Sequence, residues 1–243
     1  TPPDDCKVIH IASDPMYQMV PVRGFPADIS LTCPADIAFR SLLPVMAEHA
    51  RGAQEKIAIR RDKITAAHAE LEEAWRSKLE RGRTQSPISP AYISHCLNNL
   101  RDPDTIMVKE SPLMGQYVDI DRPGTMLNAG AASGLGHGMG VALGAQLAAP
   151  DKLVIGTEGD GAYMFNVPVS CHYVAAEQNL PILWVVFNNQ HWQAVHRSTL
   201  GLEPDGYAAK ANRQPLTHFT VEQHYEKAVE VSGGAGFRVT ESK

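Results

Sequence analysis

Two short polar segments of the chain carry residue types that could hold a metal ion. Asp160 stands between two glycines shortly after a predicted strand at 153–157, and Asn189 follows another asparagine after an apolar run at 182–187. Asp160 offers a charged oxygen and Asn189 a neutral one, which suits Mg²⁺, because this ion takes oxygen ligands and completes its shell with phosphate and water. The flanking glycines leave the backbone bare, so amide N–H groups could approach a phosphate. These residue types predict one cradle for Mg²⁺ and an anionic diphosphate.

Neither segment is specific by itself, because Gly-Asp-Gly and Asn-Asn both occur in ordinary turns. Their combination is more informative, since about two dozen residues separate them and each follows a predicted buried strand. A strand, a helix and a second parallel strand form a right-handed unit that places the two strands close together. Because open α/β sheets bind ligands at the carboxyl ends of their strands, the two segments are predicted to converge on one point.

The elements that must position these segments alternate between strands and helices from residue 86 onward. Runs such as 181–187 are apolar on both faces, which is typical of strands buried inside a parallel sheet. The predicted strands cover 105–109, 125–129, 153–157, 182–187 and 237–240. The predicted helices cover 90–100, 135–149, 166–178 and 221–231. We therefore predict an α/β fold, doubly wound, with a mainly parallel sheet and helices on both faces.

The part of the chain before residue 86 has a different organisation. Predicted strands at 7–12 and 28–32 and a helix at 35–49 resemble the later half of a Rossmann-like domain. An alanine-rich and charged stretch follows, with apolar residues at helical spacing, and predicts a connecting helix. The predicted parts are thus a Rossmann-like piece at 1–50, a connecting helix at 51–85 and a domain at 86–243. Because strands lie close to both termini, we expect a fragment, truncated at its C-terminal end; a complete small protein with short tails is the alternative.

Composition and charge exclude several classes of function. The net charge is −5 and no basic stripe occurs, so nucleic acid is not an expected partner. No run of 18 apolar residues could span a membrane, and the N-terminal segment lacks the pattern of a signal peptide. The four cysteines are scattered and form no CxxC pair, which predicts free thiols and favours a cytoplasmic location.

Gly159-Asp160-Gly161, followed at this spacing by Asn188-Asn189, resembles the signature of thiamine-diphosphate enzymes, in particular the acetolactate synthase and benzoylformate decarboxylase group. The resemblance covers nearly the whole chain. Residues 1–50 resemble the end of the family's central domain, and residues 86–243 resemble most of the domain that holds the cofactor's diphosphate. This resemblance implies thiamine diphosphate and Mg²⁺ as cofactors, and it leaves open whether the central domain binds FAD.

The same resemblance implies residues for the metal and for the diphosphate. The metal ligands would be the side chains of Asp160 and Asn189 and the backbone carbonyl of His191. The neighbouring cofactor-binding residues, which would act mainly through their backbone, are Gly159, Gly161, Ala162, Trp192 and Gln193.

A second segment resembles the part of the family that meets the cofactor's aminopyrimidine ring. It is the glycine-rich run at 132–136, in which the carbonyl of Ser133 would accept a hydrogen bond from the ring's amine. Leu135 would be the bulky residue that bends the cofactor. No catalytic residue is assigned, because the family's activating glutamate belongs to a separate N-terminal domain that we do not expect within residues 1–243.

The implied function is a 2-keto-acid decarboxylase or carboligase of the acetolactate synthase type. The expected partners are a small 2-keto acid and a second thiamine-pyrimidine-binding domain in a homodimer or tetramer. Acetolactate synthases usually carry a glycine-methionine pair and then a tryptophan after Asn-Asn, whereas this chain has Gln193, Ala194 and Ser198. A non-ligating decarboxylase of the benzoylformate decarboxylase type therefore stays open, as does a non-catalytic thiamine-diphosphate-binding subunit.

A nicotinamide dehydrogenase is the rival enzyme class for a sequence with this alternation of strands and helices. Its fingerprint needs glycines at positions i, i+2 and i+5 after a strand. The third position is never glycine when the count starts at Gly134, Gly136 or Gly138, and no Walker-type phosphate loop occurs either. The sequence thus lacks the two most common nucleotide-binding motifs.

Overall fold

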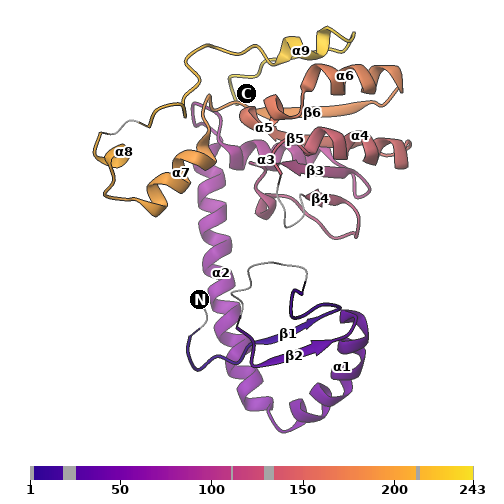
Figure 1. The fold of residues 1–243 in the computed structure, drawn as a ribbon, viewed down its shortest axis with the longest axis vertical. Helices are drawn as coiled ribbons and strands as arrows, with labels where there is room; N and C mark the ends of the chain where they lie inside the picture. Colours follow the sequence, from indigo (N-terminus) through magenta and orange to yellow (C-terminus); the bar gives the residue numbers. More distant parts are fainter. Residues whose placement is uncertain (1–2, 19–25, 111, 129–133, 212–213, 243) are drawn as a thin grey trace. The chain divides into compact units, whose positions relative to one another are not determined.

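The structure, a computed structural model, describes residues 3–18, 26–110, 112–128, 134–211 and 214–242. The chain divides into two compact units, Thr1–Glu72 and Glu73–Lys243, and Figure 1 shows that each unit has its own sheet. The division falls inside the long helix α2 (Gln54–Gly82), which lies within the predicted connecting segment. The domain boundaries at 50 and 85, and the identity of the first unit as part of a Rossmann-like domain, remain predictions.

The first unit contains a two-stranded parallel sheet and one helix of its own, besides the first part of α2. Strand β1 (Ile9–Ala12) pairs with β2 (Ile29–Thr32) along their whole length. Helix α1 (Ala35–Arg51) has an acidic residue in its first turn and basic residues in its last, which suits the helix dipole. All of α1 is described and none of its residues is buried, so this small unit has almost no core of its own.

The second unit is built around a parallel sheet in the order β4-β3-β5-β6. Its apolar strands pair in the parallel sense throughout, as runs that are apolar on both faces predict. The strands are β3 (Ile106–Glu110), β4 (Met126–Asn128), β5 (Val154–Gly159) and β6 (Ile182–Phe187).

Helices cover both faces of this sheet (Figure 1). On one face, Met107 and Ile155 pack with Leu97 of helix α3 (Pro90–Leu100). On the opposite face, Val108 packs with residues of helix α4 (Gly138–Ala148), because successive side chains of a strand point to opposite sides. The predicted fold class, α/β with a doubly wound parallel sheet, is therefore confirmed.

The helix predicted at 166–178 is α6 (Pro168–Glu177) in the structure, and a short helix that was not predicted, α5 (Asp160–Phe165), precedes it. Val167 has a left-handed backbone with φ of 51°, and the proline that follows it disfavours helical geometry at the residue before it. A first short helix therefore ends before Val167, and a second one begins at Pro168. The helices after α4 are α5 (Asp160–Phe165), α6 (Pro168–Glu177), α7 (Gln193–Leu202), α8 (Tyr207–Lys210) and α9 (Glu226–Glu230), and one 3₁₀ turn covers Gly115–Tyr117.

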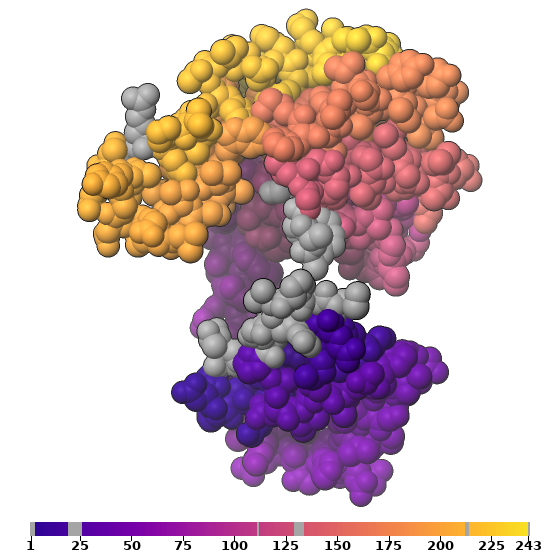
Figure 2. Space-filling model, viewed as in Figure 1, coloured from indigo at the N-terminus to yellow at the C-terminus, as the bar shows by residue number. Residues whose placement is uncertain are grey.

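The prediction of a strand at 237–240 is wrong, since these residues form no regular secondary structure. Phe237 and Val239 are 83% and 72% exposed, so neither side chain is buried against the sheet. An alternation of apolar residues favours a strand, but a strand also needs a paired neighbour, which residues 237–240 lack. In Figure 2 the yellow C-terminal residues lie on the outer surface of the second unit. The helix predicted at 221–231 is also shorter than expected, because only α9 is helical.

Helix α2 is long but strongly charged. Exposed ion pairs join residues three apart near its end: Arg76 lies 2.7 Å from Glu73, and Arg83, just after the helix, lies 3.1 Å from Glu80. Such pairs stabilise an exposed helix only slightly. Among the described residues, no helix combines the length and the apolar character that crossing a membrane requires.

Candidate cofactor site

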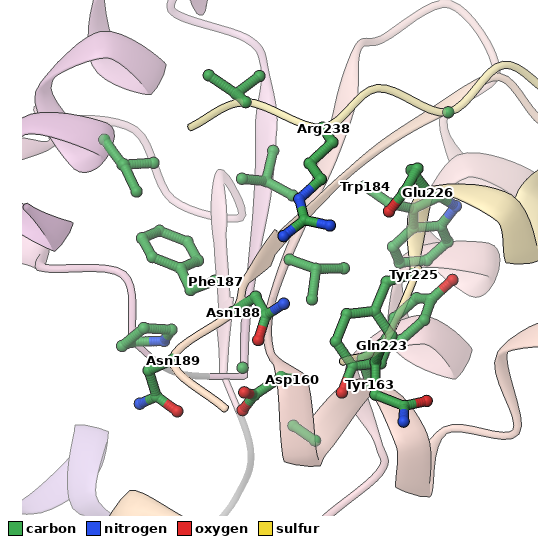
Figure 3. Close-up of a pocket in the computed structure, with 18 of the residues that line it drawn as sticks. Asp160, Tyr163, Trp184, Phe187, Asn188, Asn189, Gln223, Tyr225, Glu226 and Arg238 are labelled. Atoms are coloured by element: carbon green, nitrogen blue, oxygen red, sulfur yellow. The ribbon is translucent and has the colours of Figure 1, made fainter. Parts of the chain in front are cut away.

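The structure brings Asp160 and the turn that contains Asn189 to the same edge of the sheet. Asp160 is the first residue of α5, directly after β5, and Asn189 follows the neighbouring strand β6. The backbone N–H of Gln190, next to Asn189, donates to Asp160 Oδ2 at 2.6 Å. Figure 3 shows Asp160, Asn188 and Asn189 on the same side of one pocket. The convergence expected from the two strand ends is therefore present in the fold.

Asp160 is a buried carboxyl group that forms no ion pair with a basic side chain among the described residues. Its side chain is 3% exposed, and the ion pairs of the described residues do not include it. Burial raises the pKa of Asp160, although hydrogen bonds from the backbone N–H groups of Gly161 and Gln190 act in the opposite direction. A buried carboxylate is stabilised by a cation, so the donor set at this edge fits a hard metal ion such as Mg²⁺.

Two oxygen atoms of the turn after β6 accept hydrogen bonds from N–H groups of the same turn. Asn189 Oδ1 accepts the N–H of His191 at 2.9 Å, and the carbonyl of His191 accepts the N–H of Gln193 at 2.8 Å. Trp192 between them has φ of −70° and ψ of 68°, the geometry of an inverse γ-turn. A carbonyl or amide oxygen has two lone pairs, so both oxygens keep a second pair for a metal.

Three of the backbone N–H groups that the resemblance assigns to the diphosphate already have partners within the chain. Gly161 donates to Asp160 Oδ1 at 2.8 Å, and Trp192 donates to the carbonyl of Thr217 at 2.8 Å. Gln193 donates to His191, as described above. Ala162 lies in the first turn of α5, where helix geometry supplies no carbonyl for its N–H. Ala162 is therefore the residue whose N–H is best placed to meet an anion, and the remaining assignments stay predictions.

Trp192 contributes more than its backbone. A Cβ atom at Gly161 would lie 2.2 Å from Cζ3 of the Trp192 ring, so only glycine fits at position 161. The same ring makes edge-to-face contacts with Phe165 and Phe219, at centroid distances of 5.6 and 4.9 Å. Such aromatic contacts fix the ring's orientation. The indole therefore covers the Asp160 turn, a role that the residue type alone did not indicate.

The predicted pyrimidine segment is described only in part. Ser133 lies outside the described residues, whereas Leu135 is 51% exposed and lines the same pocket as Asp160. Helix α4 begins at Gly138 rather than near Leu135, which corrects the predicted start. The reason is Gly136, whose φ of 87° is left-handed and cannot continue a right-handed helix.

Two buried glutamates lie behind this segment. The resemblance also implies a cofactor contact at Glu110-Ser111, which stays a prediction, with Ser111 outside the described residues, whereas the pairing of Glu110 with Glu158 was not predicted. Glu110 ends β3 and Glu158 lies opposite it on β5, in register. Glu110 is 6% exposed and Glu158 fully buried. Asn166 joins them, since its Nδ2 lies 3.0 Å from Glu110 Oε2 and 3.3 Å from Glu158 Oε2. A glutamate inside an apolar strand was the available signal for this cluster.

The two carboxyl groups ionise very differently. Burial and the neighbouring charge of Glu110 raise the pKa of Glu158 to about 9, so Glu158 is protonated at neutral pH. Burial also opposes ionisation of Glu110. Hydrogen bonds from Asn166 and from the N–H groups of Gly138 and Gly136 outweigh it, and they hold the pKa of Glu110 below its ordinary value. The pair therefore carries a single negative charge, on Glu110.

An open groove of about 2140 Å³ begins at the Asp160 edge and continues along β6 to the C-terminal segment. Figure 3 shows Tyr163, Gln223 and Tyr225 on one wall, near Asp160, and Arg238 on another. Arg238 pairs with Glu222. The groove is large enough for an extended cofactor that reaches the metal edge with one end.

Comparison with known proteins assigns this half of the chain. Residues 110–243 match the family model described as "Thiamine pyrophosphate enzyme, C-terminal TPP binding domain". The chain is 28% identical over 130 residues to a chloroplastic acetolactate synthase of Arabidopsis thaliana, covering 48% of this chain and 19% of that protein. It is 34% identical over 113 residues to a benzoylformate decarboxylase of Pseudomonas aeruginosa, covering 45% of this chain and 21% of that protein.

A solved structure also matches the fold. The thiamine diphosphate-dependent 4-hydroxybenzoylformate decarboxylase of Rhodococcus jostii RHA1 has a TM-score of 0.56 and 25% sequence identity, over 65% of this chain and 29% of that one. The chain spans about a fifth of the length of the curated relatives it matches. Because the family model covers more than half of the chain, the chain belongs to the thiamine pyrophosphate enzyme family, through its C-terminal TPP-binding domain.

Proposed function

We propose that the second unit binds the diphosphate of thiamine diphosphate together with Mg²⁺ at the Asp160 edge. Asp160 and Asn189 would contribute side-chain oxygens and His191 its backbone carbonyl. One observation carries this proposal: a buried carboxyl group, with no basic side chain of the described residues paired to it, is hydrogen-bonded to the turn that holds the amide and carbonyl oxygens. One carboxylate, one amide and one carbonyl, with phosphate and water, make up a typical magnesium shell.

The chain's own residues would bind, orient and shield the cofactor. The indole of Trp192 covers the Asp160 turn, and Leu135 lines the groove where the rest of the cofactor would lie. The cofactor, when bound, supplies the carbon nucleophile for a 2-keto acid. The site's contribution is therefore positioning and a partly dry environment.

We further propose that the full enzyme decarboxylates or ligates 2-keto acids, as an acetolactate synthase-like enzyme. Its relatives include both an acetolactate synthase and a benzoylformate decarboxylase. Gln193, Ala194 and Ser198 replace the glycine, methionine and tryptophan of acetolactate synthases. This departure favours the second candidate, a non-ligating decarboxylase of the benzoylformate decarboxylase type. The activating glutamate would come from a thiamine-pyrimidine-binding domain in a cytoplasmic homodimer or tetramer.

Calorimetric titration with thiamine diphosphate in the presence of Mg²⁺ tests the proposed site. We expect the wild-type chain to bind, and Asp160→Ala to bind at least about 100-fold more weakly, because even groups that only orient metal ligands contribute about 10–100-fold. Asp151→Ala is the control, since Asp151 is an exposed carboxylate in a turn before β5. Equal affinity in the wild type and in Asp160→Ala would rule out the proposed metal site.

A further inference from the structure

We propose that Glu110 is a positioning residue that sets the distance between the two ends of the cofactor site. Its carboxylate would hold the segment 134–138, which contains Leu135, at a fixed place relative to Asp160. The inference rests on the proposed function and deepens it. Glu110 would align the pyrimidine end of the site with the diphosphate end.

Glu110 binds the segment directly and at two points. The N–H of Gly136 donates to Oε1 and the N–H of Gly138 donates to Oε2, each at 2.5 Å. His137, between these glycines, also has its Nδ1 at 3.4 Å from Oε1. The first N–H groups of a helix have no partners inside the helix, and the positive end of the helix dipole favours an anion. The carboxylate therefore fixes both the start of α4 and the turn before it.

Glu110 is also connected to α5, the helix that begins at Asp160. Asn166 follows α5 and donates through Nδ2 to Glu110 Oε2 at 3.0 Å and to the carbonyl of Ala162 at 2.9 Å. Asn166 Oδ1 accepts the N–H of Met139 in α4 at 2.9 Å. One side chain thus joins Glu110, α4 and α5, and a displacement of the pyrimidine segment would have to break several buried hydrogen bonds.

The support beneath Glu110 is rigid. Glu110 lies on β3, which has paired strands on both sides, and its side chain is almost fully buried. Sites built on strands and helices are held more accurately than sites on loops. Leu135, one residue before the clamped Gly136, points its exposed side into the groove that Asp160 also lines. A buried structural anchor elsewhere in α4 would have no such effect on the groove.

Two probes separate the two ends of the site. Inorganic pyrophosphate with Mg²⁺ reports on the diphosphate end alone, whereas thiamine diphosphate with Mg²⁺ reports on both ends. Calorimetric titration of both probes would compare the wild-type chain with Glu110→Ala and Glu110→Gln. Gln146→Ala is the matched control, because Gln146 is a fully buried polar residue at the other end of α4 that donates to the carbonyl of Lys152 at 3.1 Å.

For Glu110→Ala we expect thiamine diphosphate affinity to fall about 10-fold or more, the typical effect of losing an orienting group, while pyrophosphate affinity changes by less than about 2-fold. Glu110→Gln keeps one acceptor oxygen, so it should lose affinity for thiamine diphosphate selectively but to a smaller degree. This variant replaces Glu110→Ala in the test if the alanine variant does not fold. Gln146→Ala should lower Tm and leave both affinities unchanged.

Three outcomes would overturn the inference. Glu110 variants could lose affinity for both probes equally, as a general loss of structure would cause, or for neither probe. The wild-type chain could also bind both probes with equal affinity, which would show that the pyrimidine end contributes nothing. If the wild-type chain binds neither probe in the presence of Mg²⁺, the proposed function itself is wrong.

Discussion

Two groups of carboxyl side chains lie at the same edge of the sheet and have opposite surroundings. Glu110 and Glu158 are enclosed among Asn166 and the backbone N–H groups of α4, and together they carry one charge. Asp160, at the start of α5, is just as buried and lines the open groove, as Glu110 also does, but among the described residues no basic side chain pairs with it and no N–H group of α4 holds it. The difference indicates that the first group holds backbone in place, whereas the second is arranged to receive a ligand.

The enclosed cluster leaves no space for an added atom. A Cβ at Gly138 would lie 2.2 Å from Glu158 Oε1 and 2.8 Å from Glu110 Oε2, whereas a Cβ at Gly140, on the exposed side of the same helix, would meet nothing. We expect Gly138→Ala to lower the free energy of unfolding by about 1–3 kcal/mol through overpacking. Gly140→Ala should raise it by about 0.5–1 kcal/mol, because alanine favours a helix interior. Urea denaturation measures both changes, and a stable Gly138→Ala variant would show that the cluster is loosely packed.

The comparison also predicts a pH dependence for the enclosed pair. The pKa of Glu158 is about 9 in the folded chain and near its ordinary value when unfolded, so the folded state binds the extra proton. Stability should therefore fall as pH rises between these two values. Glu158→Gln mimics the protonated form and should lose this dependence. The difference between the Tm of Glu158→Gln and the Tm of the wild type should therefore be larger at pH 8.5 than at pH 5.5. We expect this increase to be at least about 2–4 °C, the change in Tm that 1 kcal/mol produces.

This Tm comparison is best made with a chelator present, so that no metal at the neighbouring Asp160 contributes. A Tm difference that stays constant from pH 5.5 to 8.5 would mean that Glu158 ionises normally. The account of the enclosed pair would then be wrong, while the proposed role of Asp160 would be untouched.

The smallest effect is expected at the C-terminal segment, which borders the groove but is not packed against the sheet. Phe237→Ser and Val239→Ser should change the free energy of unfolding by less than about 0.5 kcal/mol, because both side chains are exposed. Phe187→Ser, at the buried end of β6, is the contrasting variant, and loss of a buried phenylalanine costs about 3–5 kcal/mol. Large losses at Phe237 or Val239 would show that the segment packs as a strand after all.

The sequence was sufficient for the elements with strong local patterns. Helix α3 and strand β6 have the predicted bounds, because a proline begins the helix and a continuous apolar run forms the strand. The convergence of Asp160 and Asn189 was also predictable, since both follow apolar parallel strands that lie side by side, although β6 is a half-buried edge strand and not the fully buried one that its apolar run predicted.

The remaining features depend on contacts between distant segments. Glu110 meets Glu158 only because β3 and β5 are neighbours in register, and the sequence of neither strand predicts the order of strands in the sheet. Gly138 is required by those two side chains and not by its own backbone geometry. The strand prediction for residues 237–240 was wrong because an alternating pattern of apolar residues does not supply the neighbouring strand with which they would have to pair. Local sequence therefore predicted the Asp160 and Asn189 group but not the pairing of Glu110 with Glu158.

A crystal structure of the chain with Mg²⁺ and thiamine diphosphate tests the central claim most directly. We predict that one carboxylate oxygen of Asp160 and the amide oxygen of Asn189 lie at about 2.0–2.1 Å from the metal, which also contacts the diphosphate. A metal bound elsewhere, or Asp160 and Asn189 side chains that do not share one ion, would contradict the account.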